Sequence, residues 1–330
     1  MSSAVLQTDL RSRALTAKKF GTLAALTAQN TALVLVTKFS FSRARNTPYL
    51  ASTVVACSEL LKLVVSCTLL RCTNGKGSAV LAMRDLCSNS ARLALPSVLY
   101  VLQSNLLFKA VRLLSPTLYM VCSQSKILTS ALFSVLLLNS RINRRQRFAL
   151  TMLVGGMILV HKSESNHIGG ERVTASARDG DTSHGLVALF AATSISGFAG
   201  AYLEKMYKLS NDVNGKAYSV WFRNTQLACF SVPMALLSAY WRDGVAIERD
   251  GFLQGYDIIV ALVIVLQASG GLLVALVMRN AGNLLKCFAV SISMCNCAVY
   301  TVLASSDDKA VCTLAMGLLL VVASTFMYSS

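Results

Sequence analysis

The sequence predicts an all-α membrane protein with ten transmembrane helices arranged as two inverted five-helix repeats. Of its 330 residues, 54% are hydrophobic and only 14% are charged, whereas a soluble domain has roughly 45–50% and about 25%. The apolar residues gather in segments that suit a bilayer core, which takes about 20 helical residues to cross. A polar stretch at 162–184 separates five such segments from five others. Because each half has an odd number of crossings, the second half inserts in the opposite orientation.

The predicted segments are 20–38, 50–70, 93–111, 117–138, 148–161, 185–205, 219–241, 257–279, 283–304 and 309–328. The fifth is short and the third carries polar groups, so nine crossings are the alternative. We expect the first repeat at 1–161, a polar connecting loop at 162–184 and the second repeat at 185–330. Val-Leu-Gln recurs at 101–103 and 265–267, which supports a repeat.

The loop at 141–147 fixes the expected orientation. It holds four cations in seven residues, Arg141, Arg144, Arg145 and Arg147, and short cytosolic loops are enriched in Lys and Arg. Ten crossings then place both termini in the cytosol. The N-terminus shows no short apolar core followed by a cleavage site, so we expect the first helix to be a signal-anchor.

Several functional classes lack their signatures. The three histidines, His161, His167 and His184, bracket one polar loop, and no Cys-x-x-Cys occurs among the ten cysteines, so we expect no metal site and no cofactor. The net charge of +16 would suit nucleic acid, but the topology accounts for it and we expect no nucleic-acid partner. The chain has no His-Glu-x-x-His and no Gly-x-Ser-x-Gly motif, so we predict that it is not an enzyme.

Seven charged residues fall inside predicted membrane segments, where each costs at least about 2.5–3.5 kcal/mol by insertion scales. They are Glu59, Lys62, Lys126, Glu204, Lys205, Arg223 and Lys286. Glu59 and Lys62 share a helix face, which fits either an internal ion pair or a substrate site. Glu204 and Lys205 lie near a helix end and are interpreted as a pair whose charged groups extend to the membrane surface. Two acids cannot neutralise five cations, so a surplus of +3 favours a cavity for an anionic substrate.

Uncharged hydrogen-bonding groups accompany these charges. They are Gln29, Asn30, Tyr100, Gln103, Ser104, Asn105, Tyr119, Gln124, Asn224 and Gln226. A lone Asn or Gln in a membrane helix usually joins helices, but this density indicates a substrate with a large polar surface. From the residues alone, we predict a transporter or channel for a polar organic anion.

At these residues the sequence resembles the nucleotide-sugar transporter family, in the branch of the UDP-galactose, UDP-N-acetylglucosamine and CMP-sialic acid carriers. The resemblance rests on eight blocks in order, at 29–31, 58–63, 99–108, 126–138, 197–205, 220–227, 252–256 and 283–286. Ser-Glu-Leu-Leu-Lys-Leu at 58–63 and Val-Trp-Phe-Arg-Asn-Thr-Gln-Leu at 220–227 are examples.

The resemblance implies an antiporter of the Golgi membrane, or of the ER, that exchanges a cytosolic nucleotide sugar for a lumenal nucleoside monophosphate by alternating access. By resemblance, Lys126 and Lys286 would hold the phosphates, and Tyr119 would face the cavity. The nucleobase and ribose pocket would comprise Tyr100, Gln103, Ser104, Asn105 and Asn224. Glu59 with Lys62 would bound the sugar side, and Gly200 would allow a close approach of ligand or helix. Whether the chains form a homo-oligomer is left open.

Four positions depart from the family pattern: Ser104, Ser123, Gly282 and Cys287. They lie beside the expected pocket, so they bear on which base and sugar are carried. We expect a UDP-sugar, such as UDP-galactose or UDP-N-acetylglucosamine. A CMP-sialic acid carrier, an exporter of amino acids or drugs, and a non-transporting regulatory relative are the alternatives.

Overall fold

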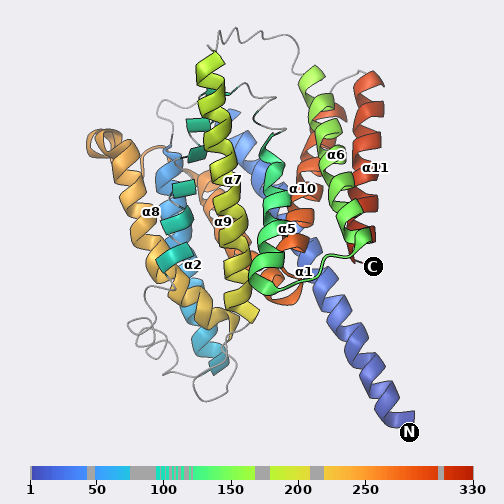
Figure 1. Cartoon of the computed structure of the whole chain (residues 1–330). Coiled ribbons are helices and arrows are strands. Elements are labelled where there is room, and N and C mark those ends of the chain that lie inside the picture. Colours follow the sequence, from blue (N-terminus) through green and yellow to red (C-terminus); the bar gives the residue numbers. More distant parts are fainter. Residues whose placement is uncertain are drawn as a thin grey trace.

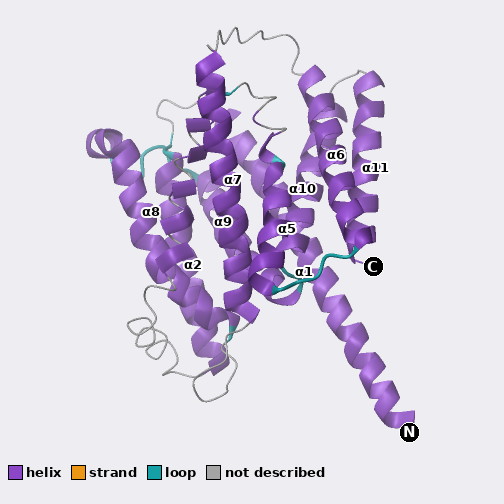
Figure 2. Ribbon diagram, viewed as in Figure 1, coloured by secondary structure: helices purple, strands orange, loops and turns teal. Residues whose placement is uncertain are grey.

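A computed structural model describes residues 2–42, 49–74, 122–167, 179–208, 219–303 and 308–329, with shorter pieces at 94–96, 98–100, 102–103, 106–107, 109–110, 113–114 and 119. Within these ranges the chain is a helical bundle without strands (Figures 1 and 2). The long helices are α1 (Ser2–Ser42), α2 (Ala51–Asn74), α5 (Ser125–Leu138), α6 (Arg144–His167), α7 (Asp179–Lys208), α8 (Val220–Asp250), α9 (Ile258–Asn280), α10 (Asn283–Leu303) and α11 (Asp308–Ser329).

Four described helical segments are long and apolar enough to cross a membrane by length and composition. They are Lys18–Thr37, Ala51–Thr73, Thr182–Lys208 and Ile258–Asn280. Two further apolar stretches, Ser125–Leu138 and Ala315–Tyr328, are shorter. The prediction of a membrane protein built from helices agrees with this architecture.

Several helices extend beyond the apolar segments that predicted them. The expected crossing at 148–161 is the middle of α6, which begins at Arg144 and ends at His167. Helix α7 begins at Asp179, so helix occupies both ends of the stretch expected to be a connecting loop. Helix α8 continues to Asp250 rather than ending near 241. The apolar pattern marks where a helix meets lipid, and polar residues prolong a helix into water without changing that pattern.

Side chains and glycines set the ends of the helices around the centre of the bundle. The Asp257 carboxylate accepts from the backbone N–H of Val260 at 2.9 Å and caps α9. Ser219 caps α8 in the same way, by accepting from Phe222 N at 3.2 Å. Between α9 and α10, Gly282 has a φ of +92°, a conformation that glycine adopts without the steric cost of a Cβ.

The bundle packs through helix pairs that are distant in sequence. α6 packs on α11, α2 on α8, α5 on α7, and α1 on α9 and α10. At the α6–α11 contact, a Cβ built on Gly156 would lie 2.9 Å from the Gly317 carbonyl oxygen, and the reverse distance is also 2.9 Å. These two glycines therefore allow the close approach that small residues give in membrane helix pairs. Beside them, α10 inserts the fully buried Phe288 into the core.

Candidate functional site

A cavity of about 460 Å³ lies in the half of the bundle formed by α2, α7, α8, α9 and the segment at 96–100. We call it the central cavity. Its polar lining consists of Ser52, Glu59, Lys62, Tyr100, Tyr207, Asn224, Ser231, Ser238 and Arg242. Along α8 the lining runs from Asn224 to Arg242, which is about 27 Å at 1.5 Å per residue. The α8 wall of the cavity is thus nearly as long as the roughly 30 Å hydrocarbon thickness of a bilayer, whereas the α2 wall runs only from Ser52 to Lys62.

Glu59 and Lys62 form an ion pair on α2, one of the two readings that their spacing left open, and both also line the central cavity. The carboxylate has a second partner, because the Ser231 hydroxyl of α8 donates to the same oxygen. Across the cavity, a Cβ on Gly271 of α9 would lie 2.9 Å from Lys62 Cδ. Gly271 therefore leaves the space on α9 that the Lys62 side chain occupies next to Glu59.

Tyr207 and Asn224 join α7 to α8 on the cavity wall. The Tyr207 hydroxyl donates to Asn224 Oδ1 at 2.7 Å, and both residues are buried. Asn224 Nδ2 is buried without a hydrogen-bond partner in the described part of the chain. The amide thus keeps a free donor, a group that costs stability unless a ligand or water accepts from it.

Lys126 and Lys286 lie on the contacting helices α5 and α10, and the structure brings them close enough for their charges to interact. Lys286 is half-buried and Lys126 is exposed. Neither lines the central cavity. Within the described ranges neither lysine forms an ion pair, although the Glu204 carboxylate lies close enough for its charge to act on Lys286.

The other predicted residues fall in different places. Gly200 lies against Asn283, since a Cβ there would be 2.6 Å from both side-chain polar atoms of Asn283. Gln103 has a buried Oε1 with no partner in the described ranges. Tyr119 packs beside the apolar cluster of Ala110, Leu114, Ala188 and Leu189. Ser104 and Asn105 lie outside the described residues.

The expected pairing of Glu204 with Lys205 is wrong. Glu204 is buried, pairs with Lys208 at 2.5 Å and accepts from the backbone N–H of Asn283 at 2.7 Å. Residues four apart share a helix face and adjacent residues do not, so Lys208 and not Lys205 reaches the carboxylate. Glu204 thereby ties the end of α7 to the start of α10.

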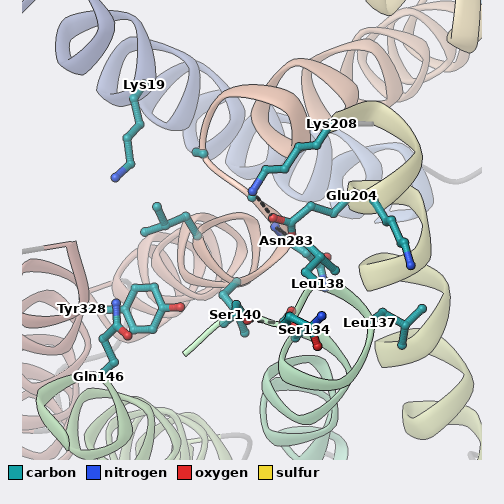
Figure 3. A pocket seen from close by; sticks show the side chains of 16 residues that line it. Lys19, Ser134, Leu137, Leu138, Ser140, Gln146, Glu204, Lys208, Asn283 and Tyr328 are labelled. Carbon is teal, nitrogen blue, oxygen red and sulfur yellow. Dashed lines mark hydrogen bonds and ion pairs between the residues drawn. The ribbon is translucent and has the colours of Figure 1, made fainter. Parts of the chain in front are cut away.

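A second cavity, of about 650 Å³, lies beside this contact between the ends of α5 and α7 and the start of α10. We call it the end pocket (Figure 3). Lys19 of α1, Gln146 of α6 and Tyr328 of α11 complete its wall. The two cavities share no lining residue. On α7, Leu203 and Tyr207 face the central cavity, while Glu204 and Lys208 face the end pocket.

Five polar lining residues of the central cavity were not predicted from the sequence: Ser52, Tyr207, Ser231, Ser238 and Arg242. Tyr207 and Ser231 carry no charge that marks them within an apolar helix, and Arg242 follows the end of the expected crossing. Near Arg242, the kinked residue Asp243 accepts from the Ser52 hydroxyl. Only the packing of α8 against α2 and α7 reveals these neighbours. No group of three metal-ligating side chains occurs among the described residues.

The sequence is similar to known transporters over almost its whole length. The model of the nucleotide-sugar transporter family matches residues 14–329. A UDP-N-acetylglucosamine/UDP-N-acetylgalactosamine transporter of Caenorhabditis elegans is 38% identical over 320 residues, which cover 94% of this chain and 93% of that protein. The human UDP-N-acetylglucosamine transporter is 36% identical and covers 94% of each chain. The UDP-galactose transporter of Schizosaccharomyces pombe is also 36% identical, over 94% of this chain and 87% of that protein.

A crystal structure of a protein 14% identical in sequence aligns over 96% of each chain with a TM-score of 0.58. At this identity the likeness concerns the fold alone. The relatives reported above transport nucleotide sugars and are not enzymes. With a family model that matches almost the whole chain, the chain belongs to the nucleotide-sugar transporter family.

Proposed function

We propose that this protein carries a UDP-sugar, such as UDP-N-acetylglucosamine or UDP-galactose, from the cytosol into the Golgi lumen in exchange for a nucleoside monophosphate. The observation that carries the proposal is the central cavity, whose largely apolar wall carries polar groups from α2, α7 and α8. Its volume of about 460 Å³ falls within the range of about 300–1,000 Å³ for small-molecule sites. The relatives' substrates favour uridine over cytidine as the base.

Two inverted repeats would supply alternating access. Under such symmetry α5 corresponds to α10, α1 to α7, and α2 to α8. With α6 corresponding to α11, the symmetry would map the α5–α7 contact onto the α10–α1 contact. It would map the α2–α8 contact and the α6–α11 contact onto themselves. All four contacts occur. Rocking of one repeat against the other would expose the same site to either side of the membrane.

Substrate charge and base would be read by different groups. By the family resemblance Lys126 and Lys286 would hold the phosphates; neither forms an ion pair in the described ranges, and neither lines the central cavity in this structure, so both would have to approach the substrate in another state of the transport cycle. Asn224 would read the base or ribose through its free Nδ2, together with Tyr100, Gln103, Ser104 and Asn105. Glu59 and Lys62 would bound the sugar side, with Tyr119 as a further cavity residue and Gly200 as a packing position.

Counterflow in proteoliposomes tests the exchange. Vesicles preloaded with UMP should take up the UDP-sugar much faster than empty vesicles, without a proton or sodium gradient. Uptake that ignores preloading but follows an ion gradient would contradict obligatory exchange. Preloading with CMP should stimulate less than UMP. The reverse order would identify a CMP-sugar carrier, and no stimulation by UMP, CMP or GMP would indicate a non-transporting relative.

Lys286→Ala tests the phosphate role in the same assay. It should abolish uptake while the protein still reaches the membrane, because the substrate's phosphates lose a cation. Lys18→Ala, an exposed lysine that lines neither cavity, is the matched control and should transport normally. Uptake at the wild-type rate by Lys286→Ala would leave Lys286 with a purely structural role.

A further inference from the structure

The end pocket carries a charge surplus that the central cavity does not explain. Its lining holds three cations, Lys19, Lys205 and Lys208, and one acid, Glu204. Glu204 is committed to Lys208 and to Asn283 N. Within the described ranges Lys19 and Lys205 form no ion pair. The lining therefore has a net charge of +2, which favours an anion in a concave site where the local field is strengthened.

Buried polar groups without partners line the same pocket. Asn283 is 1% exposed, and neither its Nδ2 nor its Oδ1 has a hydrogen-bond partner in the described part of the chain. The hydroxyl of Ser134, 3% exposed, is also unpartnered there. Both residues line the pocket (Figure 3). Such groups are rare in native proteins and each calls for a missing partner, such as a ligand.

The pocket has the size and place of a separate site. Its volume of about 650 Å³ exceeds that of the central cavity. It opens where the α5–α6 connection, the α9–α10 connection and the end of α11 meet, next to Lys19 of α1. On α7, Glu204 and Lys208 lie about 100° around the helix from Leu203 and Tyr207, which face the central cavity. A ligand here would thus contact a different set of residues.

We propose that the end pocket is a second binding site, specific for a phosphate ester. Lys19 and Lys205 attract the phosphate, and Asn283 and Ser134 satisfy their hydrogen-bonding groups on it or on the group that it esterifies. A free nucleotide and a phospholipid headgroup share this chemistry. The pocket lies at the water-facing ends of the helices, so both can reach it.

Equilibrium binding to the purified full-length chain tests the site and separates the two sources. In detergent without added lipid, radiolabelled UMP should bind twice per chain if the ligand is a nucleotide, and once per chain in Lys19→Gln/Lys205→Gln. If the ligand is a lipid, UMP binds once in both proteins. Wild-type chains should then retain phosphatidylinositol from mixed phosphatidylcholine–phosphatidylinositol micelles at least about tenfold better than the double variant, since charge-assisted contacts are lost.

Two further variants guard against indirect effects. Lys18→Gln/Arg144→Gln removes two exposed cations that do not line the pocket and should bind both probes like the wild type. Ser134→Ala should leave the melting temperature unchanged or higher, because it removes an unpartnered buried hydroxyl, and should weaken binding. If Lys19→Gln/Lys205→Gln matches the wild type with both probes, or differs no more than the control pair, the proposal is wrong.

Discussion

Gly197 offers a quantitative test of how α5 and α7 are held together. A Cβ at this position would lie 2.7 Å from the backbone carbonyl carbon of Thr129 and 2.8 Å from Ser130 N. Carbon atoms in contact prefer about 3.5 Å or more, so Gly197→Ala must separate the helices by about 0.8 Å. The Thr129 hydroxyl donates to the Thr193 carbonyl at 2.8 Å across the same contact. The same shift would stretch that bond beyond about 3.2 Å, the ordinary limit.

The opposing contributions can be compared. Overpacking costs about 1–3 kcal/mol and the hydrogen bond about 1 kcal/mol, whereas alanine gains about 1 kcal/mol over glycine in a helix. We therefore expect Gly197→Ala to lower the free energy of unfolding by about 1–3 kcal/mol. Gly155 of α6 is the matched control, because a Cβ there meets nothing within 4 Å. Gly155→Ala should be neutral or stabilising.

Thermal melting of the two variants in detergent, followed by loss of the monodisperse peak, measures the difference. Gly197→Ala should melt below the wild type, and Gly155→Ala should not. Equal melting temperatures for the two variants would refute the close α5–α7 contact. The contact matters for function because α5 carries Lys126 and α7 carries Glu204 and Tyr207, so a shift should also reduce transport.

Three further predictions concern charge. Glu59→Gln should destabilise the protein, because Lys62 and the Ser231 hydroxyl lose their shared carboxylate; Glu59→Gln/Lys62→Met should recover stability but not transport, as read from melting and counterflow. In a background without the native cysteines, Asn143→Cys should react with an impermeant maleimide only from the cytosolic side, and lumenal labelling would reverse the orientation. Hydrogen bonds from Arg249 lower the pKa of Asp250 below 3.8, so the contribution of this exposed pair is complete above pH 3.8 and is lost as the pH falls through the lowered pKa. Asp250→Asn should therefore change the melting temperature by the same small amount at pH 5 and at pH 7, and an effect that varies with pH in that range would contradict this assignment.

The sequence predicts the helices well because lipid imposes a strong constraint. Apolar length alone locates α2 and α9 to within a few residues, since an unpaired backbone cannot remain in hydrocarbon. It does not locate the ends of α6 or α8, where polar residues continue the helix into water. The ion pair of Glu59 and Lys62 was predictable because both partners share one helix face. The partner of Glu204 was not, because Lys208 lay outside the expected crossing.

The contacts between helices could not be predicted from the sequence. Tyr207 and Asn224 are 17 residues apart and on different helices, so only the register of α7 against α8 shows that they meet. The separation of the two cavities has the same origin. Leu203, Glu204, Tyr207 and Lys208 are close in sequence, and only the packing of α7 shows which pair faces which cavity. A polar residue in an apolar segment thus indicates that a binding site is present. The tertiary structure shows which of the two cavities the residue lines.

The pairing of charges also refines the argument for exchange. The seven intramembrane charges leave a surplus of +3. In the structure Glu59 forms an ion pair with Lys62, and Glu204 forms one with Lys208. Neither acid forms an ion pair with Lys126 or Lys286 in the described ranges, although the charges of Lys126 and Glu204 both act on Lys286. An anion between the two lysines would relieve their repulsion, and its departure would restore it. The empty carrier should therefore reorient slowly, and a nucleoside monophosphate on the return path would remove that barrier. The preference for exchange over uniport would thus come from two lysines rather than from an ion gradient.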